Sequence, residues 1–311
     1  MLPRVDLGNF PTPVERVTLR NGQLLLVKRD DLTAAHVGGN KVRALEWLLA
    51  GIRAGDRVLT VGPRGSTHAL ITATFARRLG AHVTVVRWNQ PMNSAARCVS
   101  GRLEAEASIV DARVVAGTYA IAGVLRLRRR TRWIPAGAAT PVAVLGHVNA
   151  ALELVEQSKR GEFELPTRVV VPLGTGGTAA GLALGFRLSG VPVQVVAVRV
   201  VSNILGRRGR VLSFANRAAQ LIERVTRERL PRVNADDVII ANGFYGAGYG
   251  RPLDALADER ALETLGVRLD DTYSRKAFAA ASALGNHATL FWLTFDGRLL
   301  ETGAKRLETG D

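Results

Sequence analysis

Short apolar runs along the chain alternate with segments whose apolar residues recur at helical spacing. Runs such as 57–61 and 82–87 are typical of buried strands, and the residues between them, 66–79, carry the helical pattern. Strands that alternate with helices predict parallel sheets covered by helices, which is an α/β architecture. By this pattern we expect strands at 23–28, 57–61, 82–87, 108–115, 168–171 and 193–201, and helices at 42–52, 66–79, 94–107, 142–157 and 178–188.

The alternation is divided by a loop rich in small residues, 133–141 (WIPAGAATP). We therefore expect two three-layer α/β units with parallel twisted sheets. The small domain is expected at 43–145, and the large domain is expected to combine 1–42 with 146–311. Ligands of such folds collect where strand ends and helix N-termini meet, so the site is expected in a cleft between the two units.

Length and composition place the chain among ordinary folded proteins. It has 311 residues, of which 47% are hydrophobic and 22% are charged, so it can bury a sizeable core. The opening MLPRVDLGNFPTP lacks the apolar stretch of a signal peptide, and no run approaches the roughly 20 apolar residues of a membrane span. A single cysteine, Cys98, excludes an internal disulfide and argues against a zinc site. We expect a cytoplasmic protein with no metal and no membrane partner.

The formal net charge of +15 raises the question of nucleic-acid binding. The charge is spread along the chain, and its densest run, 126–132 (RLRRRTR), is accompanied by no zinc-finger or aromatic RNA-binding pattern. Only five of the 42 basic residues are lysines, which indicates a general enrichment in arginine. We therefore expect no nucleic-acid partner, although association with anions at low salt fits the charge.

A glycine-rich turn, GTGGT, joins an expected strand to an expected helix. Gly174, Gly176 and Gly177 permit positive φ and close backbone approach. The N–H groups of Thr175 to Thr178 can then converge on an anion at the helix start, and the two threonines add hydroxyl donors. This is the chemistry of a phosphate cup, although a purely structural tight turn would have a similar sequence.

Two nucleotide-binding motifs compete for the same turn. The spacing of Gly174, Gly176 and Ala179 loosely matches a dinucleotide-binding fingerprint, which needs an acidic residue about 20 residues further on. No acidic residue occurs between Leu165 and Ile222, and no Gly-Lys-Ser/Thr follows the turn as in a Walker A loop. The phosphate expected here therefore does not belong to a dinucleotide.

A lysine follows two glycines in the segment 38–41 (GGNK), directly before an amphipathic helix. This position places Lys41 near the positive end of a helix dipole, which lowers the pKa of the amine and favours its neutral form. A neutral amine is required to form a Schiff base with an aldehyde. A solvated lysine at a helix start is the alternative that this segment alone leaves open.

Together these motifs resemble the fold type II enzymes that depend on pyridoxal 5′-phosphate (PLP), and among them the D-cysteine desulfhydrase and 1-aminocyclopropane-1-carboxylate (ACC) deaminase family. The resemblance covers most of the chain, through FPTPVERV, VKRDDLTAAHVGGNKVRALEWLL, VGPRGSTHALITATFARRLG, WIPAGAATPVAVLGHVNAALEL, VVPLGTGGTAAGLALG, GAGYGRP and LDDTYSRKAF. Its most specific part is the pair GGNK and GTGGT at this separation. It implies a tryptophan synthase β-like fold, PLP as cofactor, a small amino acid as substrate and a homodimer.

The resemblance also assigns roles to individual residues. Lys41 becomes the Schiff-base lysine, and the two tyrosines of GYG and DDTYS line the substrate pocket, for which ordinary half-buried packing is the alternative. The implied catalytic residues are Lys41, Ser66, Tyr249 and Tyr273. The implied cofactor-binding residues are Lys41, Asn40, Thr67, Gly174, Thr175, Gly176, Gly177, Thr178 and Ser274, and the implied substrate-binding residues are Ser66, Thr67 and His68.

The chain departs from the family pattern at three places. Thr67 replaces the Asn of the family's Ser-Asn-His run, and Arg64-Gly65 replaces the residues that usually precede it. The family's late HTGG is present only as LTFDG at 293–297. We expect that part of the pocket to be remodelled, with consequences for substrate choice.

The residue after Tyr273 bears on the reaction. The resemblance implies that Lys41 removes the Cα proton of the substrate, that a β-substituent leaves, and that hydrolysis yields a 2-oxo acid and ammonia. ACC deaminases of this family have Glu after the tyrosine, whereas this chain has Ser274, as desulfhydrase-like members have Thr or Ser. A hydroxyl leaves the pyridine nitrogen neutral, which suits loss of a thiolate better than opening of a cyclopropane. We expect D-cysteine desulfhydrase-like β-elimination, with ACC deamination as the alternative and a catalytically weak PLP-binding protein as the alternative of another class.

Overall fold

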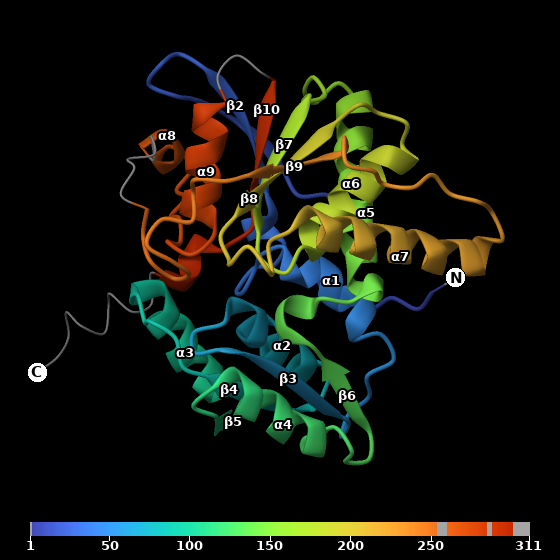
Figure 1. The fold of residues 1–311 in the computed structure, drawn as a ribbon, viewed down its shortest axis with the longest axis vertical. Coiled ribbons are helices and arrows are strands. Elements are labelled where there is room, and N and C mark those ends of the chain that lie inside the picture. Colours follow the sequence, from blue (N-terminus) through green and yellow to red (C-terminus); the bar gives the residue numbers. More distant parts are fainter. Residues whose placement is uncertain (1, 254–259, 285–287, 301–311) are drawn as a thin grey trace, which may run out of the picture.

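The computed structural model describes residues 2–253, 260–284 and 288–300. Within them the chain forms two units, one above the other along the long axis, each built on one sheet (Figure 1). The larger sheet has the strand order β1-β2-β10-β7-β8-β9, and the smaller has the order β5-β4-β3-β6. Among these described strands, β1 and β2 pair antiparallel and the other neighbours pair parallel.

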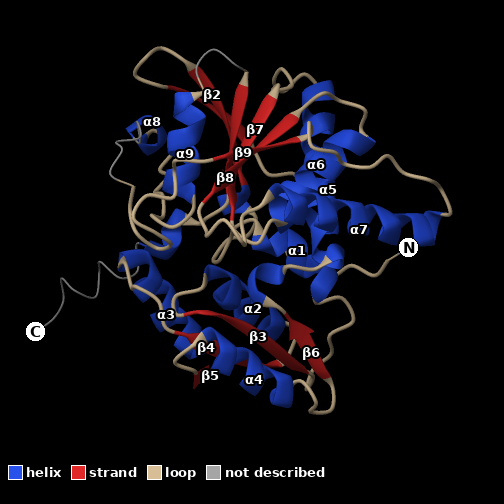
Figure 2. Ribbon diagram, viewed as in Figure 1, coloured by secondary structure: helices blue, strands red, loops and turns tan. Residues whose placement is uncertain are grey.

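Helices cover both faces of the larger sheet (Figure 2). Val169 and Val171 of β7 pack into the core with α5 and α6, while Val170 between them packs with Phe278 of α9. Strands buried on both faces in this way are typical of parallel sheets. The strands are β1 (Val14–Thr18), β2 (Leu24–Arg29), β7 (Arg168–Leu173), β8 (Gln194–Arg199), β9 (Val238–Ala241) and β10 (Thr289–Leu293). The helices are α5 (Pro141–Lys159), α6 (Gly177–Leu188) and α7 (Arg208–Thr226) on one face, and α8 (Arg260–Glu263) and α9 (Ser274–Ala283) on the other.

The smaller sheet is covered in the same manner. Val83 and Val85 of β4 pack with α2 and α3, and Val86 packs on the other face with Ala122 of α4. Its elements are β3 (Arg57–Pro63), β4 (His82–Trp88), β5 (Ser108–Asp111), β6 (Thr131–Ile134), α2 (Thr67–Arg78), α3 (Ser94–Glu106) and α4 (Val115–Leu125). Helix α1 (Lys41–Leu48) packs beside α2 through Leu45. Short 3-10 turns occur at Asp30–Leu32, Ala136–Ala138 and Gly297–Leu300.

The prediction of an α/β fold with parallel sheets is confirmed, and the expected elements occur with their ends shifted by a few residues. The expected strand at 108–115 is wrong at its end, because β5 stops at Asp111 and Val115 begins α4. Sequence analysis missed several elements: β1, β6, β9, β10, α4, α7, α8 and α9. The domain boundaries at 43 and 145 stay a prediction. Of the helices described, none has the length and apolar character that crossing a membrane requires.

Candidate active site

A cavity of about 580 Å³ lies between the two units. It is lined from the small unit by the end of β3 at Pro63 and the start of α2, and from the large unit by Pro172 of β7 and the turn that follows it. Both sheets therefore present the carboxyl ends of their strands to the cavity, the edge where ligands of open α/β sheets bind. The sequence predicts a ligand site in a cleft between the two units, and this cavity lies there.

Lys41 begins α1 and lines the cavity. Its Nζ donates a hydrogen bond to the carbonyl oxygen of Gly137 at 3.2 Å. Burial lowers the pKa of this amine from 10.5 to about 8. The sequence argument attributed a lowered pKa to the helix dipole, whereas in the structure the cause is burial.

The two glycines before Asn40 allow the loop to pack where a side chain would not fit. A Cβ at Gly38 would lie 2.0 Å from the carbonyl oxygen of Asp31, and Gly39 has a φ of +119°. The Gly38 N–H donates to Asp296 Oδ2 at 2.8 Å. Asp296 belongs to the segment that replaces the family's HTGG. Through this hydrogen bond the altered segment stabilises the loop that carries Lys41.

The turn GTGGT has the geometry of an anion site. Gly176 adopts a φ of +97° as the N-cap of α6, and the helix begins at Gly177. The first N–H groups of a helix have no acceptor within the helix and favour an anion. All five turn residues line the cavity: Gly174, Thr175, Gly176, Gly177 and Thr178.

The lysine loop and the glycine turn are joined directly. The Asn40 side-chain amide donates to Thr178 Oγ1 at 2.8 Å. Gly137 provides a second, indirect connection, because it packs closely against the turn: a Cβ at Gly137 would lie only 2.7 Å from Thr175 Cγ2. Gly137, whose carbonyl accepts from Lys41, therefore lies between the lysine and the turn. The structure brings together the two motifs that the sequence singled out.

The start of α2 contributes the residues of the Ser-Thr-His run. Ser66 is the N-cap of the helix, and its Oγ accepts from the Ala69 N–H at 3.3 Å. Ser66, Thr67 and His68 all line the cavity. The ring nitrogens of His68 lie 3.1 Å from Thr60 Oγ1 and 3.5 Å from the hydroxyl of the threonine one turn further along α2. Burial, together with the nearby charge of Lys41, lowers the pKa of His68 to about 3. Its role in substrate binding stays a prediction.

Two tyrosines from separate loops meet at the cavity. The hydroxyls of Tyr249 and Tyr273 share a hydrogen bond, and their rings cross at 83° with centroids 5.8 Å apart. Burial raises the pKa of Tyr249 to about 12 and holds that of Tyr273 well above its usual value. Both phenols therefore stay protonated at neutral pH and can donate a hydrogen bond or a proton. A Cβ at Gly174 would lie 3.3 Å from Tyr273 Cε1, so this tyrosine borders the glycine turn.

Ser274 begins α9 with a fully buried side chain. Its N–H donates to Asp270 Oδ1 at 2.9 Å, and Asp270 also accepts from the N–H groups of Thr272 and Tyr273. The Ser274 hydroxyl has no partner of good geometry among the described residues, but it lies close enough to Asp270 to counteract the rise in the pKa of that carboxyl that burial causes. Ser274 does not line the cavity, so its role in binding the cofactor stays a prediction.

Sequence analysis missed several residues of the site. Besides Gly137, they include His147, whose Nε2 lies 3.4 Å from Thr178 Oγ1 and whose buried Nδ1 has no partner among the described residues. Burial lowers the pKa of His147 well below its usual value, so the ring is neutral. Arg210 donates from Nε to the Thr175 carbonyl at 3.0 Å. Gly137 lies in a loop whose small residues were noted, whereas His147 and Arg210 lie within helices and carry no local signal.

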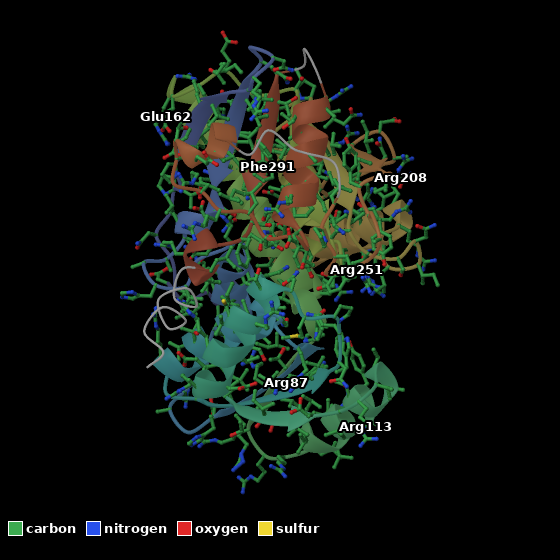
Figure 3. The ribbon with its side chains drawn as sticks, turned by 90° about the vertical axis from the view of Figure 1, so that its left-hand side faces the viewer. Arg87, Arg113, Glu162, Arg208, Arg251 and Phe291 are labelled. Atoms are coloured by element: carbon green, nitrogen blue, oxygen red, sulfur yellow. The ribbon has the colours of Figure 1, made fainter. Side chains whose placement is uncertain are left out.

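Exposed arginines lie on both units on the side where Figure 3 shows a gap between them. Arg208 and Arg251 belong to the large unit and Arg113 to the small unit, and all three lie toward the right-hand side of that view. Within the part of the chain that the structure describes, no ion pair includes them. We refer to these three exposed residues, which do not themselves line the cavity, as the arginine rim.

These residues fit a cofactor that combines an aldehyde and a phosphate. The amine of Lys41, with its lowered pKa, suits the aldehyde, and the turn at 174–178 suits the phosphate. The fold and the site thus define an enzyme that holds a phosphorylated aldehyde on a lysine.

Comparisons with known proteins agree. The family model described as "Pyridoxal-phosphate dependent enzyme" matches residues 5–291, so the chain belongs to this family of PLP-dependent enzymes. It is 37% identical to the nocardicin C-9′ epimerase of Nocardia uniformis subsp. tsuyamanensis, over 94% of this chain and 92% of the relative. It is 30% identical to the D-cysteine desulfhydrase of Salmonella choleraesuis (strain SC-B67), over 89% of this chain and 87% of the relative. A crystal structure of an ACC deaminase homologue superposes with a TM-score of 0.79 and 27% identity, covering 99% of this chain and 96% of that chain. The predictions of a fold type II architecture and of PLP as cofactor are confirmed.

Proposed function

We propose that the protein catalyses β-elimination on a small amino acid, as a D-cysteine desulfhydrase-like lyase that releases a 2-oxo acid and ammonia. The observation that carries the proposal is the position of Lys41, whose buried amine lies beside the glycine turn and at the edge of the cavity. With a pKa of about 8, roughly a tenth of this amine is neutral at pH 7, which is enough to act both as nucleophile and as base.

The chain's own residues divide the work. PLP, when bound through the turn and Lys41, supplies an electron sink for the pair of electrons left at the substrate Cα. Lys41 Nζ takes the Cα proton. The N-terminus of α2, with the hydroxyls of Ser66 and Thr67, faces the cavity and suits the substrate carboxylate. The protonated tyrosine pair is placed to donate a proton to a leaving group.

Ser274 supports elimination over ACC deamination. Its hydroxyl is neutral and directly follows Tyr273, which lines the cavity, so in this proposal it hydrogen-bonds to a ring nitrogen without protonating it. A neutral ring withdraws electrons less strongly, which is sufficient when the leaving group is good. A thiolate meets that condition better than the carbon–carbon bond of a cyclopropane.

A substrate panel tests this proposal. The holoenzyme is given D-cysteine, β-chloro-D-alanine, L-cysteate and ACC, and release of the 2-oxo acid is measured. We expect turnover of the first two and little or none of ACC. Turnover of ACC with D-cysteine inert would instead establish the deaminase alternative. The Lys41→Ala variant serves as the control, since it should lose both turnover and the visible absorbance of lysine-bound PLP.

Epimerisation at Cα is a second candidate, favoured by the 37% identity to a protein named as an epimerase. Two proton carriers border the glycine turn, Lys41 near Thr175 and Tyr273 near Gly174, which is the minimum that removal and return of a proton at different positions would need. The same panel in deuterium oxide separates the two reactions. Elimination gives a 2-oxo acid, whereas epimerisation gives the other enantiomer with deuterium at Cα and no 2-oxo acid.

The proposal includes a cytoplasmic homodimer. The dimer comes from the family resemblance. The location comes from the sequence, whose composition with one cysteine is compatible with a reducing compartment. Light scattering of the purified holoenzyme measures the oligomeric state, and a monomeric mass at working concentration would refute the dimer.

A further inference from the structure

An aromatic wall lines the outer part of the cavity on the small unit. Trp88 ends β4, next to Pro63 at the end of β3, and lines the cavity together with Tyr119 of α4. The rings of Trp88 and Tyr119 stack at 6.5 Å with an interplanar angle of 27°, and Trp133 meets Tyr119 edge-on at 6.5 Å. The two tryptophans stand on strands of the sheet, and Tyr119 of α4 packs against both of them.

The large unit provides an apolar wall at the same cavity. Leu205, in the loop before α7, and Tyr245 both line the cavity. Arg210, at the start of α7, also lines this cavity, so residues of both units border the same space as Tyr119.

Large apolar side chains on and beside these two walls are unusually exposed. The exposed fraction is 48% for Val115, 44% for Tyr119 and 47% for Leu205, and all three line the cavity. Their sequence neighbours Val114 and Ile204 are exposed by 62% and 76%. Apolar side chains that gather around a concave site, rather than being scattered singly, are typical of a ligand-binding surface.

None of the residues on these two walls is needed to hold PLP or the α-amino acid group. The lysine, the turn, Ser66 and the tyrosine pair provide for those, and they lie on other segments of the lining. The volume of about 580 Å³ falls in the middle of the range of roughly 300–1,000 Å³ that pockets for drug-sized ligands span. Beside the segments that hold the cofactor, the two walls thus line an apolar compartment of this cavity.

We propose that this compartment is a side-chain subsite, and that the substrate is an amino acid whose side chain bears an aryl group beyond Cβ. The inference rests on the proposed function: it keeps the reaction at the same site and replaces the small amino acid by one with a larger, aryl-bearing side chain. The aryl group lies between the wall of Trp88 and Tyr119 and the wall of Leu205. Aromatic rings packed against aromatic side chains gain from both burial and ring–ring contact.

The test compares binding of two thioether amino acids that differ in this group alone. S-benzyl-D-cysteine and S-methyl-D-cysteine, with their L enantiomers, are titrated into the holoenzyme, and the dissociation constant is read from the change in visible absorbance. We expect the benzyl compound to bind at least about tenfold more tightly in the preferred enantiomer. Equal dissociation constants, or weaker binding of the benzyl compound, would overturn the subsite.

Variants locate the effect. Leu205→Ala and Tyr119→Ala should reduce the benzyl preference several-fold while leaving binding of S-methyl-D-cysteine unchanged. Leu24→Ala, at a position 54% exposed on β2, is the matched control and should leave the preference unchanged. Leu205 is on a surface loop, so its truncation tests the subsite even if loss of Tyr119 loosens the small unit. If these variants instead convert a dimer into monomers with the benzyl preference intact, the exposed apolar residues form a subunit interface and the subsite is refuted.

This binding assay separates the inference from the proposed function. Preferential binding of the benzyl compound without release of a 2-oxo acid would support the subsite and refute β-elimination. Release of a 2-oxo acid from both thioethers, with no preference in binding, would support elimination and refute the subsite.

Discussion

Asn93 connects the small unit to the two segments that carry the tyrosine pair. It is the N-cap of α3, and its Oδ1 accepts from the Ala96 N–H at 2.8 Å. Its Nδ2 donates to the Gly250 carbonyl at 2.9 Å and lies 3.5 Å from Thr272 Oγ1. Gly250 follows Tyr249 and Thr272 precedes Tyr273, so a single side chain positions both phenols.

The two functions of Asn93 can be separated by substitution. Asn93→Ser retains a capping oxygen and removes the amide donor, whereas Asn93→Ala removes both. A net hydrogen bond contributes about 0.5–1.5 kcal/mol. If that energy positions the tyrosines in the transition state, kcat/KM falls by about 2- to 12-fold in both variants. Loss of the cap costs roughly a further 1 kcal/mol of unfolding free energy in the alanine variant alone.

The assay is kcat/KM on a substrate that the panel identifies, alongside urea unfolding of each variant. The expected pattern is that serine and alanine lower kcat/KM to the same extent, while only alanine lowers stability by the value of the cap. Wild-type kcat/KM in Asn93→Ser would refute the positioning role. A fall in kcat/KM that tracks stability across both variants would show that Asn93 acts through the fold of α3.

Three other predictions concern the cofactor and the approach of substrate. The rate at which apoprotein captures PLP should rise with pH and level off above about 8, because the neutral amine of Lys41 reacts and its pKa is lowered from 10.5; a rate still rising at pH 10 contradicts this lowered pKa. Arg210→Met should weaken PLP binding by roughly tenfold in equilibrium dialysis, because it removes the bond to the Thr175 carbonyl, whereas Arg217→Met, exposed on the same helix, should have no effect. Added salt should raise the dissociation constant of anionic L-cysteate more than that of zwitterionic D-cysteine by screening the arginine rim; identical salt profiles would show that the rim does not attract anionic ligands.

The motif-bearing part of the site was predictable from sequence because its chemistry is local. Two adjacent glycines before Asn-Lys and three glycines in GTGGT indicate a backbone that packs closely against a neighbouring group. The structure identifies these neighbouring groups. At Gly38 that neighbour is the Asp31 carbonyl, and at Gly174 it is the Tyr273 ring. The buried strands β3 and β7 were also predictable, since they are apolar over most of their length, whereas β1, β6, β9 and β10 were missed.

The contacts that join the motifs were not predictable, because they link residues far apart in sequence. Asn40 bonds to a threonine 138 positions away, and Asn93 to a glycine 157 positions away. His147 and Arg210 lie on ordinary helical positions and become part of the site only after α5, α6 and α7 pack together. The predicted strand was extended wrongly to Val114 and Val115 because both residues are apolar. In the structure both are exposed, and Val115 lines the cavity instead of packing in a sheet core.

Chemistry and substrate choice are therefore encoded in different parts of this chain. Lys41 and GTGGT fix the bond that the enzyme can make to its cofactor, and any member of the family with those motifs shares that capability. Trp88, Tyr119 and Leu205 belong to no motif and come from both units, so they can change without disturbing the lysine or the turn. Relatives named as an epimerase and a desulfhydrase match nearly the whole of this chain at 37% and 30% identity. The outer walls of the cavity are where a difference in substrate should be sought first.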